Sequence, residues 1–393
     1  MKQSQPKIRI GHLIKIYGEN PRNALKLFRE GGTRDSILQA TGQVLGIADV
    51  SLTINHRELF VVMGLSGSGK STLVRCINRL INPTSGHIYL DDEDIAHVDE
   101  KRMRQLRLTR VSMVFQQFGL FPHKTVADNV EYGLKIRGVE KNKRRKKALE
   151  TLEVVGLEQW ADYLPSSLSG GMRQRVGLAR ALATDAEILL MDEPFSALDP
   201  LIRREMQDEL LRLQKELHKT IVFISHDIQE ALKIGDRIAV MKDGYIVQVG
   251  TPEELVTQPK DDYIRAFIQD VNRASVLKAG TIARKIMPLT LGQDSVKVAL
   301  EEMLAHNLQQ MYVVDSDGKP VGIVNKQTIE VAIAQGKEDL TQLMKADFPK
   351  VEASISLEDT FPLYQHGLPV AVVDQEGKFV GIVEDSDIFT NIG

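Results

Sequence analysis

The sequence predicts an α/β protein made of two parts, and two observations carry that prediction. In the first part, apolar runs of buried-strand type at 58–63, 187–191 and 220–225 alternate with stretches of helical spacing. Strands that alternate with helices indicate a mostly parallel sheet, whose ligands bind where its strands end. In the second part, a short motif recurs at a constant spacing, which predicts a smaller repeated module.

Two elements between and after these runs can be placed from pattern alone. Between the second and third apolar runs, Met206, Leu210, Leu213 and Leu217 fall on one face of a helix. The segment 238–247 has two apolar runs around an Asp-Gly pair, which predicts a tight β-hairpin.

The bulk composition indicates an intracellular protein of two or three domains. The chain has 393 residues and one cysteine, Cys76, which has no partner for an internal disulfide. The polar N-terminus and the absence of a long apolar stretch favour a peripheral role at any membrane. From Gly280 onward there are 9 basic and 17 acidic residues in a chain of net charge −3, so the front is basic and the tail acidic. This asymmetry suggests modules with different partners.

A phosphate-binding loop follows the first predicted strand. Its glycines allow backbone amides to converge on phosphate oxygens, while Lys70 reaches the terminal phosphates and Ser71 binds Mg²⁺. The strand before it and the helix after it make a chance match improbable. The predicted ATP-binding residues are Gly64, Leu65, Ser66, Gly67, Ser68, Gly69, Lys70, Ser71 and Thr72.

Two adjacent carboxylates end the second predicted strand. Asp192 is placed to hold Mg²⁺, and Glu193 is a candidate general base for the attacking water. Adjacent acidic residues are more often a solvated surface pair, but the apolar strand before them and Pro194 after them favour the catalytic interpretation.

A second glycine loop, 168–172, has no nucleotide in a domain that binds only one, so it indicates another molecule. With the motifs above it resembles the ATPase cassette of ABC transporters over roughly the first 270 residues. The resemblance implies a P-loop NTPase cassette with a parallel-sheet core, an antiparallel β subdomain and a helical subdomain. It implies that this signature loop acts in trans on the nucleotide of a partner subunit in a homodimer, through Ser169, Gly170, Gly171 and Met172. Met172 departs from the family's usual glutamine.

The same resemblance implies four further roles. Gln116 contacts Mg²⁺ and links hydrolysis to the transmembrane partner, His226 contacts the γ-phosphate as the switch histidine, and Asp199 organises the dimer interface. Tyr17 matches the adenine-stacking aromatic, and an ordinary surface tyrosine is the alternative.

The repeat in the tail resembles a tandem of CBS domains. Val313, Gly318 and Val321 recur as Val372, Gly377 and Val380, at an offset of 59. Each copy reads as a helix, a strand, a turn and a strand, too small to bury its own apolar face, so the copies should pack together. The predicted division of the chain is an ABC ATPase domain at 1–271, a linker at 272–279, a first CBS domain at 280–336 and a second at 337–393.

The long segment after Tyr17 and the tail repeat resemble the ATPase subunits of glycine betaine and proline betaine importers. The resemblance implies an ATPase that powers osmoregulated uptake through integral membrane permease subunits, with a substrate-binding protein or domain. It places the protein peripherally on the cytoplasmic side of the cell membrane. Import of choline, carnitine or an amino acid is the alternative within transport. A soluble ABC protein acting on ribosomes or DNA is the rival outside it.

The CBS tandem leaves two alternatives open, a purely structural role or the binding of an adenine-containing ligand. Of the Thr and Asp that contact ribose in ligand-binding members, only Asp387 is present, so simple AMP or ATP binding is disfavoured. Cyclic di-AMP at an interface between two tandems is the ligand that family analogy suggests.

The densest charge run lies between residues 141 and 147. It is a solvated helix face in the plainer interpretation, and a contact with anionic lipid head groups in the sharper one. The basic residues are Lys141, Lys143, Arg144, Arg145, Lys146 and Lys147. No recognition module accompanies them, so we expect no nucleic-acid partner.

Overall fold

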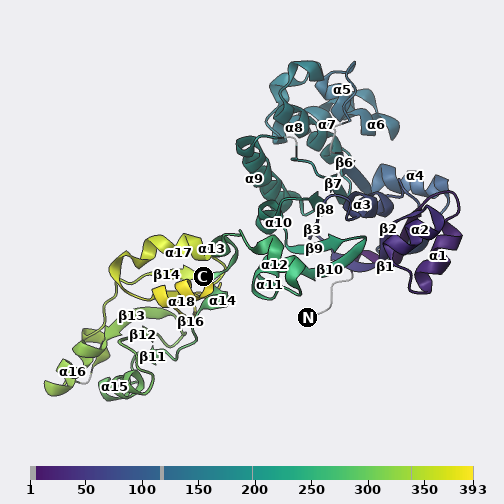
Figure 1. Ribbon diagram of the computed structural model, residues 1–393. Coiled ribbons are helices and arrows are strands. Elements are labelled where there is room, and N and C mark those ends of the chain that lie inside the picture. The colour runs from purple at the N-terminus through teal and green to yellow at the C-terminus, as the bar shows by residue number, and fades with distance from the viewer. Residues whose placement is uncertain (1–5, 116–118, 197, 338, 393) are drawn as a thin grey trace. The chain divides into compact units, whose positions relative to one another are not determined.

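The computed structural model describes residues 6–115, 119–196, 198–337 and 339–392, which fall into two compact units, Met1–Gln269 and Asp270–Gly393 (Figure 1). Each unit has its own sheets and its own buried cores. No helix within these described ranges is both long and apolar enough to cross a membrane.

The core sheet of the first unit has the strand order β10-β9-β3-β8-β7-β6. Its strands are parallel except for the hairpin of β9 and β10, which turns at Asp243 and Gly244 as predicted. The strands are β3 (Leu59–Met63), β6 (Val111–Val114), β7 (Ile188–Asp192), β8 (Thr220–Ser225), β9 (Arg237–Lys242) and β10 (Tyr245–Gly250). The predicted strands β3, β7 and β8 lie side by side, buried along their length.

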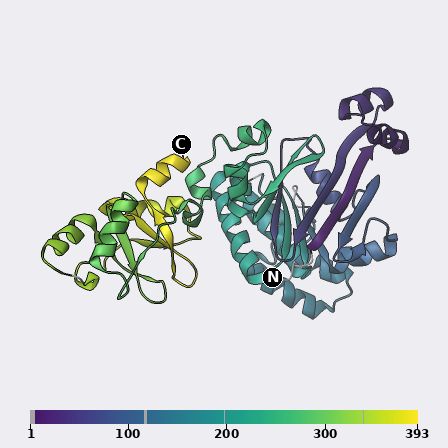
Figure 2. The same cartoon turned by 90° about the horizontal axis from the view of Figure 1, so that it is seen from below.

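A second, antiparallel sheet shares its core with the first, because Ile8 and Ile88 pack in the same buried cluster as Phe60 and Val62 of β3. Its strand order is β2-β1-β4-β5. The strands are β1 (Pro6–Tyr17), β2 (Val44–Asn55), β4 (Ser85–Leu90) and β5 (Glu93–Asp94). Figure 2 shows the long purple strands running side by side.

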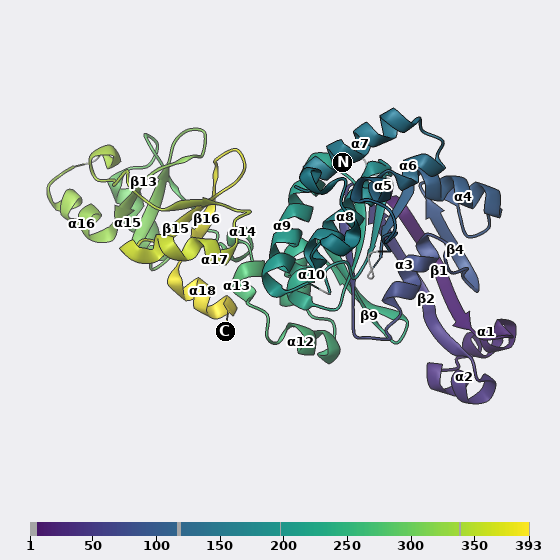
Figure 3. The ribbon, with the colours of Figure 1, turned by 90° about the horizontal axis from the view of Figure 1, so that it is seen from above.

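The long segment after Tyr17 forms a helical hairpin, α1 (Pro21–Arg29) and α2 (Arg34–Thr41). Ala24 and Ile37 are buried against Ile16 and Leu45, so the hairpin packs on the end of β1 and β2 (Figure 3).

Helices α5 to α8 form a helical group in which α5, α7 and α8 pack on one another (Figure 1). They are α5 (Val126–Val130), α6 (Tyr132–Ile136), α7 (Lys141–Val154) and α8 (Gly170–Ala183), with the 3-10 turns η1 (Glu158–Trp160) and η2 (Pro165–Ser167) between the last two. The other helices of this unit are α3 (Lys70–Ile77), α4 (Glu100–Thr109), α9 (Pro200–Leu217), α10 (Ile228–Ile234), α11 (Pro252–Thr257) and α12 (Asp262–Ile268).

The second unit contains the two repeats. Its sheets have the orders β11-β12-β13 and β14-β15-β16. The strands are β11 (Leu289–Thr290), β12 (Gln310–Val314), β13 (Pro320–Asn325), β14 (Lys350–Glu352), β15 (Val370–Val373) and β16 (Phe379–Val383). The helices are α13 (Arg273–Val276), α14 (Ala279–Ile282), α15 (Val296–Ala305), α16 (Lys326–Ala334), α17 (Leu357–Thr360) and α18 (Asp385–Ile392), with 3-10 turns η3 (Leu340–Gln342) and η4 (Phe361–His366).

The repeats pack face to face, as their small size requires. Tyr312 and Ile323 of the first repeat share a buried cluster with Ala371 and Ile382 of the second. The Tyr312 hydroxyl donates to the main-chain oxygen of Pro369 at 2.6 Å, so a hydrogen bond joins the repeats inside this apolar interface.

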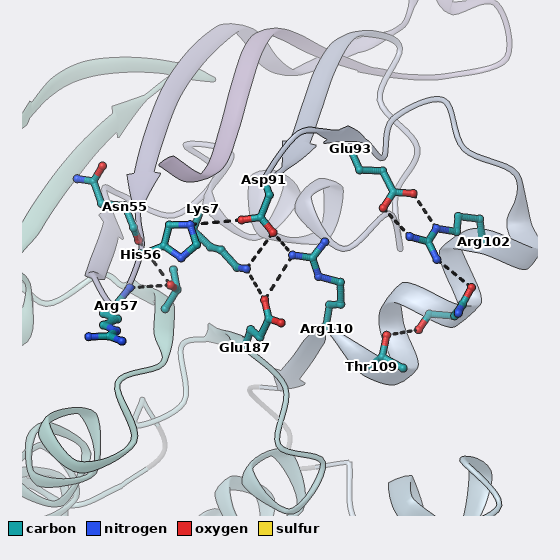
Figure 4. A network of polar contacts seen from close by, with 12 residues as sticks. Lys7, Asn55, His56, Arg57, Asp91, Glu93, Arg102, Thr109, Arg110 and Glu187 are labelled. Atoms are coloured by element: carbon teal, nitrogen blue, oxygen red, sulfur yellow. Dashed lines mark hydrogen bonds and ion pairs between the residues drawn. The ribbon is translucent and has the colours of Figure 1, made fainter. Parts of the chain in front are cut away.

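An ion-pair network ties the antiparallel sheet to the core sheet (Figure 4). Lys7 is 4 % exposed, and its ammonium group lies 3.0 Å from Asp91 Oδ2 and in contact with Glu187. Arg110 contacts the same two carboxylates, and His56 Nε2 lies 3.4 Å from Asp91 Oδ1. Because Lys7 is the second residue of β1 and Glu187 directly precedes β7, the network joins the two sheets.

Candidate functional site

The phosphate loop joins β3 to α3, and two of its glycines, Gly64 and Gly69, are required by close backbone contacts. A Cβ at Gly64, where φ is 146°, would overlap the main-chain oxygen of Met241, and one at Gly69 would lie 2.6 Å from that of Gly46. Ser68 Oγ is buried without a hydrogen-bond partner among the described residues. The loop is therefore a tight cradle with a buried polar group available to a ligand.

Lys70 begins α3 and lies inside this cradle. Its side chain is buried, and its ammonium group donates to the main-chain oxygens of Gly64 at 2.9 Å and Leu65 at 3.1 Å. Burial lowers the Lys70 pKa, while the charges of Glu193 and Asp192 act in the opposite direction. A concentrated positive charge thus faces the space where the loop amides converge.

Asp192, the last residue of β7, is 1 % exposed and faces the first turns of α3. Its Oδ1 accepts a hydrogen bond from Ser71 Oγ at 2.7 Å, and its Oδ2 accepts one from Arg75 Nη2 at 3.0 Å. A hydroxyl and a carboxylate side by side are the hard oxygen ligands that Mg²⁺ prefers, so this pair fits the ion. The third predicted ligand, Gln116, lies outside the described residues.

Glu193 follows Asp192 in a left-handed backbone conformation, with φ of 47°. This conformation is costly for a residue with a side chain, and it interrupts the alternation of a strand. Both carboxylates consequently reach the start of α3: Glu193 Oε1 lies 3.9 Å from Lys70 Nζ, and Glu193 Oε2 lies 3.2 Å from His226 Nδ1. The structure brings these predicted residues together.

A buried carboxylate holds the loop that carries His226. Glu230, on α10, accepts hydrogen bonds from Ser225 Oγ at 2.5 Å and from Gln207 Nε2 at 3.1 Å. Ser225 Oγ in turn accepts one from the amide of Asp227 at 2.9 Å. Burial raises the Glu230 pKa despite these hydrogen bonds. Residues on both sides of His226 are thereby held in place.

The signature loop opens α8 in the helical group. Ser169 caps this helix, accepting a hydrogen bond from the Met172 amide at 3.3 Å. A Cβ at Gly171 would lie 2.6 Å from Ile202 Cγ2, whereas one at Gly170 would meet open space. Asp199 likewise caps α9, accepting from the Ile202 amide at 3.1 Å. The roles of these residues toward a second subunit stay predictions.

Tyr17 lies beside the phosphate loop rather than on an unrelated surface. Its hydroxyl forms a 3.0 Å hydrogen bond with Thr72 Oγ1, and its ring lies against Gly46, where a Cβ would be 2.7 Å away. The side chain is 37 % exposed, so the ring can meet a base. This placement favours the stacking interpretation over the alternative.

The basic run splits into two classes on α7. Arg144 lies 3.0 Å from Glu131, and Arg145 lies 2.5 Å from Asp162, so these two are used in ion pairs within the chain. The remaining members are exposed: Lys141, Lys143, Lys146 and Lys147.

In the CBS unit, Asp387 accepts a hydrogen bond from the Glu384 amide at 2.9 Å at the start of α18. Next to it a cleft of about 530 Å³ is bounded by both repeats, with Arg284, Glu384 and Asp385 among its lining residues. Arg284 is paired with Glu384 at 2.6 Å, so the charge left over at this rim is acidic.

Sequence reasoning missed Arg75 and Glu230. Arg75 follows Ser71 by four residues on a helix, a spacing that places both side chains on one face, and this signal was available. Glu230 carries no such signal, because a glutamate on a helix is normally exposed.

Comparison with known proteins places these features in a family. A model described as "ABC transporter" matches residues 47–196, and one described as "CBS domain" matches 282–334 and 339–393. The glycine betaine transport ATP-binding protein OpuAA of Bacillus subtilis is 45% identical over 96% of this chain and 90% of its own length. The chain belongs to the ATP-binding subunits of ABC transporters. The glycine betaine/proline betaine transport ATP-binding protein ProV of Escherichia coli is likewise 45% identical, over 96% of this chain and 95% of its own.

A solved ATP-binding cassette supports the same assignment for the first unit. It is a dimer in a post-hydrolysis state bound to ADP and phosphate, with 33% identity and a TM-score of 0.54 over 62% of this chain and 98% of its own. The predicted fold class is confirmed: an ABC cassette followed by tandem CBS domains. As an ABC ATP-binding subunit the chain is an ATPase that uses ATP and Mg²⁺, and proteins of this kind work as cassette pairs with a membrane permease.

Proposed function

We propose that this ATP-binding subunit powers osmoregulated uptake of glycine betaine or a related quaternary amine. The observation that carries the proposal is similarity over 96% of the chain to proteins named for glycine betaine transport. Alternatives come from the same comparisons: relatives named for trimethylamine N-oxide, choline and carnitine transport are 46%, 35% and 35% identical. The partners we propose are a second copy of this chain, integral permease subunits and a substrate-binding protein or domain, at the cytoplasmic side of the cell membrane.

Uptake into proteoliposomes with the cognate permease tests the cargo. Glycine betaine should enter faster than choline, carnitine or trimethylamine N-oxide at equal concentration, and uptake should change with internal salt. Faster entry of a competitor would reassign the cargo and leave the ATPase chemistry untouched.

For hydrolysis we propose Glu193 as the general base, because its carboxylate is the one nearest His226 and Lys70. Lys70 and the loop amides would bind the phosphates, Ser71 and Asp192 would hold Mg²⁺, and His226 would contact the γ-phosphate beside Glu193. Mg²⁺ supplies charge neutralisation at the phosphates when bound. Ser169, Gly170 and Gly171 would meet the γ-phosphate held by the other subunit, with Asp199 at the interface.

The variant Glu193→Gln tests this assignment. It should keep ATP binding, since the phosphate contacts are untouched, and lose turnover by at least about a hundredfold, the scale of a general base. Glu100→Gln is the matched control, because that carboxylate is 70% exposed on α4. Rapid steady-state hydrolysis by Glu193→Gln would contradict the base assignment.

The CBS tandem is the proposed regulator of this activity. Family analogy suggests that cyclic di-AMP would bind at an interface between two tandems, and the acidic rim of the cleft within one tandem disfavours a phosphate there. A purely structural tandem is the alternative. Calorimetry of the full chain with cyclic di-AMP decides between them, and the absence of heat would favour the structural role.

Anionic lipid contact is the remaining part of the proposal, now centred on the four exposed lysines of α7. Each basic side chain near an anionic surface contributes about 1 kcal/mol, and the attraction weakens as salt rises. Replacing Lys141, Lys143, Lys146 and Lys147 with Gln should reduce the salt dependence of transport in anionic membranes. An unchanged salt dependence would leave the solvated-face interpretation.

A further inference from the structure

Two imidazoles converge on one carboxylate at the β5 edge of the antiparallel sheet. His87 Nδ1 lies 2.7 Å from Asp94 Oδ2, and His97 Nδ1 lies 2.9 Å from the same oxygen. One ligand atom from each of the three residues falls within 4.8 Å of the others. We propose that His87, Asp94 and His97 form a binding site for a divalent transition metal such as Zn²⁺.

The strand pairing explains why these side chains meet. Tyr89 of β4 pairs directly with Asp94 of β5, so their side chains share a face of the sheet. His87 is two residues before Tyr89 and therefore lies on that face as well. The chain then turns after Asp94 and brings His97 back beside His87, with ring centroids 5.2 Å apart.

The backbone fixes the carboxylate before any metal arrives. Asp94 Oδ1 accepts hydrogen bonds from the amides of Ala96 at 3.1 Å and Ile88 at 3.4 Å. Oδ2 is thereby aimed at the two imidazoles. Such outer contacts are what orient a metal-ligating carboxylate, and their loss typically weakens binding about ten- to a hundredfold.

The adjoining segments are also anchored. Glu93, next to Asp94, forms a two-pronged ion pair with Arg102 of α4 at 2.7 and 2.8 Å (Figure 4). The His87 ring stacks on Tyr89, at a centroid distance of 5.9 Å. Two of the three candidate ligands are therefore held by contacts that a metal would leave intact.

The donor chemistry selects the metal class. A neutral imidazole can carry its proton on Nε2, which leaves the Nδ1 lone pair free to bind a metal. Two nitrogens and one carboxylate oxygen suit Zn²⁺, Ni²⁺ or Cu²⁺, whereas Mg²⁺ prefers oxygen. Three protein ligands leave a fourth tetrahedral position of Zn²⁺ for water.

The geometry needs little adjustment. Bonds of about 2.0–2.2 Å in a tetrahedron separate neighbouring ligand atoms by roughly 3.4 Å, so the imidazoles would move outward by about half an ångström. The His87 and His97 side chains are 53% and 64% exposed, which leaves room for that shift.

Zinc calorimetry of the full chain, stripped of metal and nucleotide, tests the site. The wild type should bind one Zn²⁺ at micromolar concentration or tighter, should bind Ni²⁺, and should show no heat with Mg²⁺ at this site. His97→Gln and Asp94→Asn should each weaken zinc binding at least about tenfold. Asn keeps an oxygen that can accept the hydrogen bond from the Ala96 amide, so β4 and β5 should still pair.

The matched control is His12→Gln. His12 is also an exposed histidine beside a carboxylate, with Nδ1 2.8 Å from Asp49, but among the described residues no third ligand joins that pair. This variant should bind zinc as the wild type does. Zinc should raise the melting temperature of the wild type and of His12→Gln, and not that of His97→Gln. Absent zinc binding by the wild type up to about 100 μM, or full binding by both site variants, would overturn the proposal.

Discussion

Replacing Lys7 with Met tests the ion-pair network that joins the two sheets of the cassette. Met keeps most of the volume of the buried stem and removes the charge. Asp91 and Glu187 then retain Arg110 as their shared cation. Any loss of stability therefore reports the contribution of the Lys7 ammonium group.

The size of the loss follows from burial. Two unit charges about 4 Å apart attract by roughly 4 kcal/mol at an effective dielectric constant of about 20. Breaking a fully buried pair costs about 3–5 kcal/mol. Here the lysine side chain is 5% exposed, but the side chains of Asp91 and Glu187 are 33% and 55% exposed, so water screens much of the attraction. We expect a loss of about 1–2 kcal/mol, with a fall in melting temperature of roughly 2–8 °C.

The loss should depend on pH. Burial raises the Asp91 pKa, but hydrogen bonds from Lys7 and Arg110 outweigh it and hold the pKa below its ordinary value. The Lys7 hydrogen bond likewise lowers the Glu187 pKa, more than burial raises it. A depressed carboxyl pKa contributes stability above the unfolded value, about 4, that is lost as pH falls through the folded value. The difference between wild type and variant should be full at neutral pH and shrink below about pH 4.

Urea unfolding followed by tryptophan fluorescence measures the effect. The chain has one tryptophan, Trp160, and it lies in the cassette, so the signal reports that unit. Lys26→Met is the control: this lysine is 75% exposed, and its removal should change stability by less than about 0.5 kcal/mol. A Lys7→Met loss no larger than the control's, or one independent of pH, would refute the reasoning.

Two further outcomes follow from buried hydrogen bonds. Glu230→Ala should cost roughly 2–3 kcal/mol in urea unfolding and lower the ATPase rate, because Ser225, the residue before His226, loses its buried partner. Glu230→Gln should restore most of the stability and most of the rate. Equal rates for the two variants would argue against a positioning role. Tyr312→Phe should destabilise the CBS unit by about 1–3 kcal/mol in calorimetric unfolding, since the Pro369 oxygen loses its 2.6 Å hydrogen bond inside the apolar interface, and no change in the CBS transition would show that the bond contributes nothing.

The cassette could be predicted largely because its chemistry is local in sequence. The glycines that a tight loop requires stand next to the lysine and the serine whose side chains the loop positions. The conformation of the segment from Gly64 to Ser71 can therefore be predicted from its own sequence. The predicted apolar face of α9 shows how burial ends with the helix: Met206, Leu210 and Leu213 are buried, whereas Leu217, the last residue of α9, is 41% exposed.

The contacts that cross the fold were not predictable in this way. The contact between His87 and Asp94 depends on the register of β4 and β5, which one sequence does not specify. The left-handed backbone of Glu193 has no local signal in the sequence either. The ion pairs of Arg144 with Glu131 and of Arg145 with Asp162 depend on how the helices pack. Because of these pairs, only the four lysines of the basic run are exposed. Local patterns predicted which residues gather at the phosphate loop, and tertiary packing decided what they touch.

The hydrogen bond and apolar cluster shared by the two CBS repeats have a consequence for how such modules are exchanged between proteins. A gene boundary drawn between the repeats would leave Tyr312 on one fragment and its Pro369 acceptor on the other, with two apolar faces open to water. We therefore expect a chain cut between the repeats to be less stable than one that keeps both or loses both. An engineer who wishes to move this module to another cassette should cut before the first repeat, never between the two.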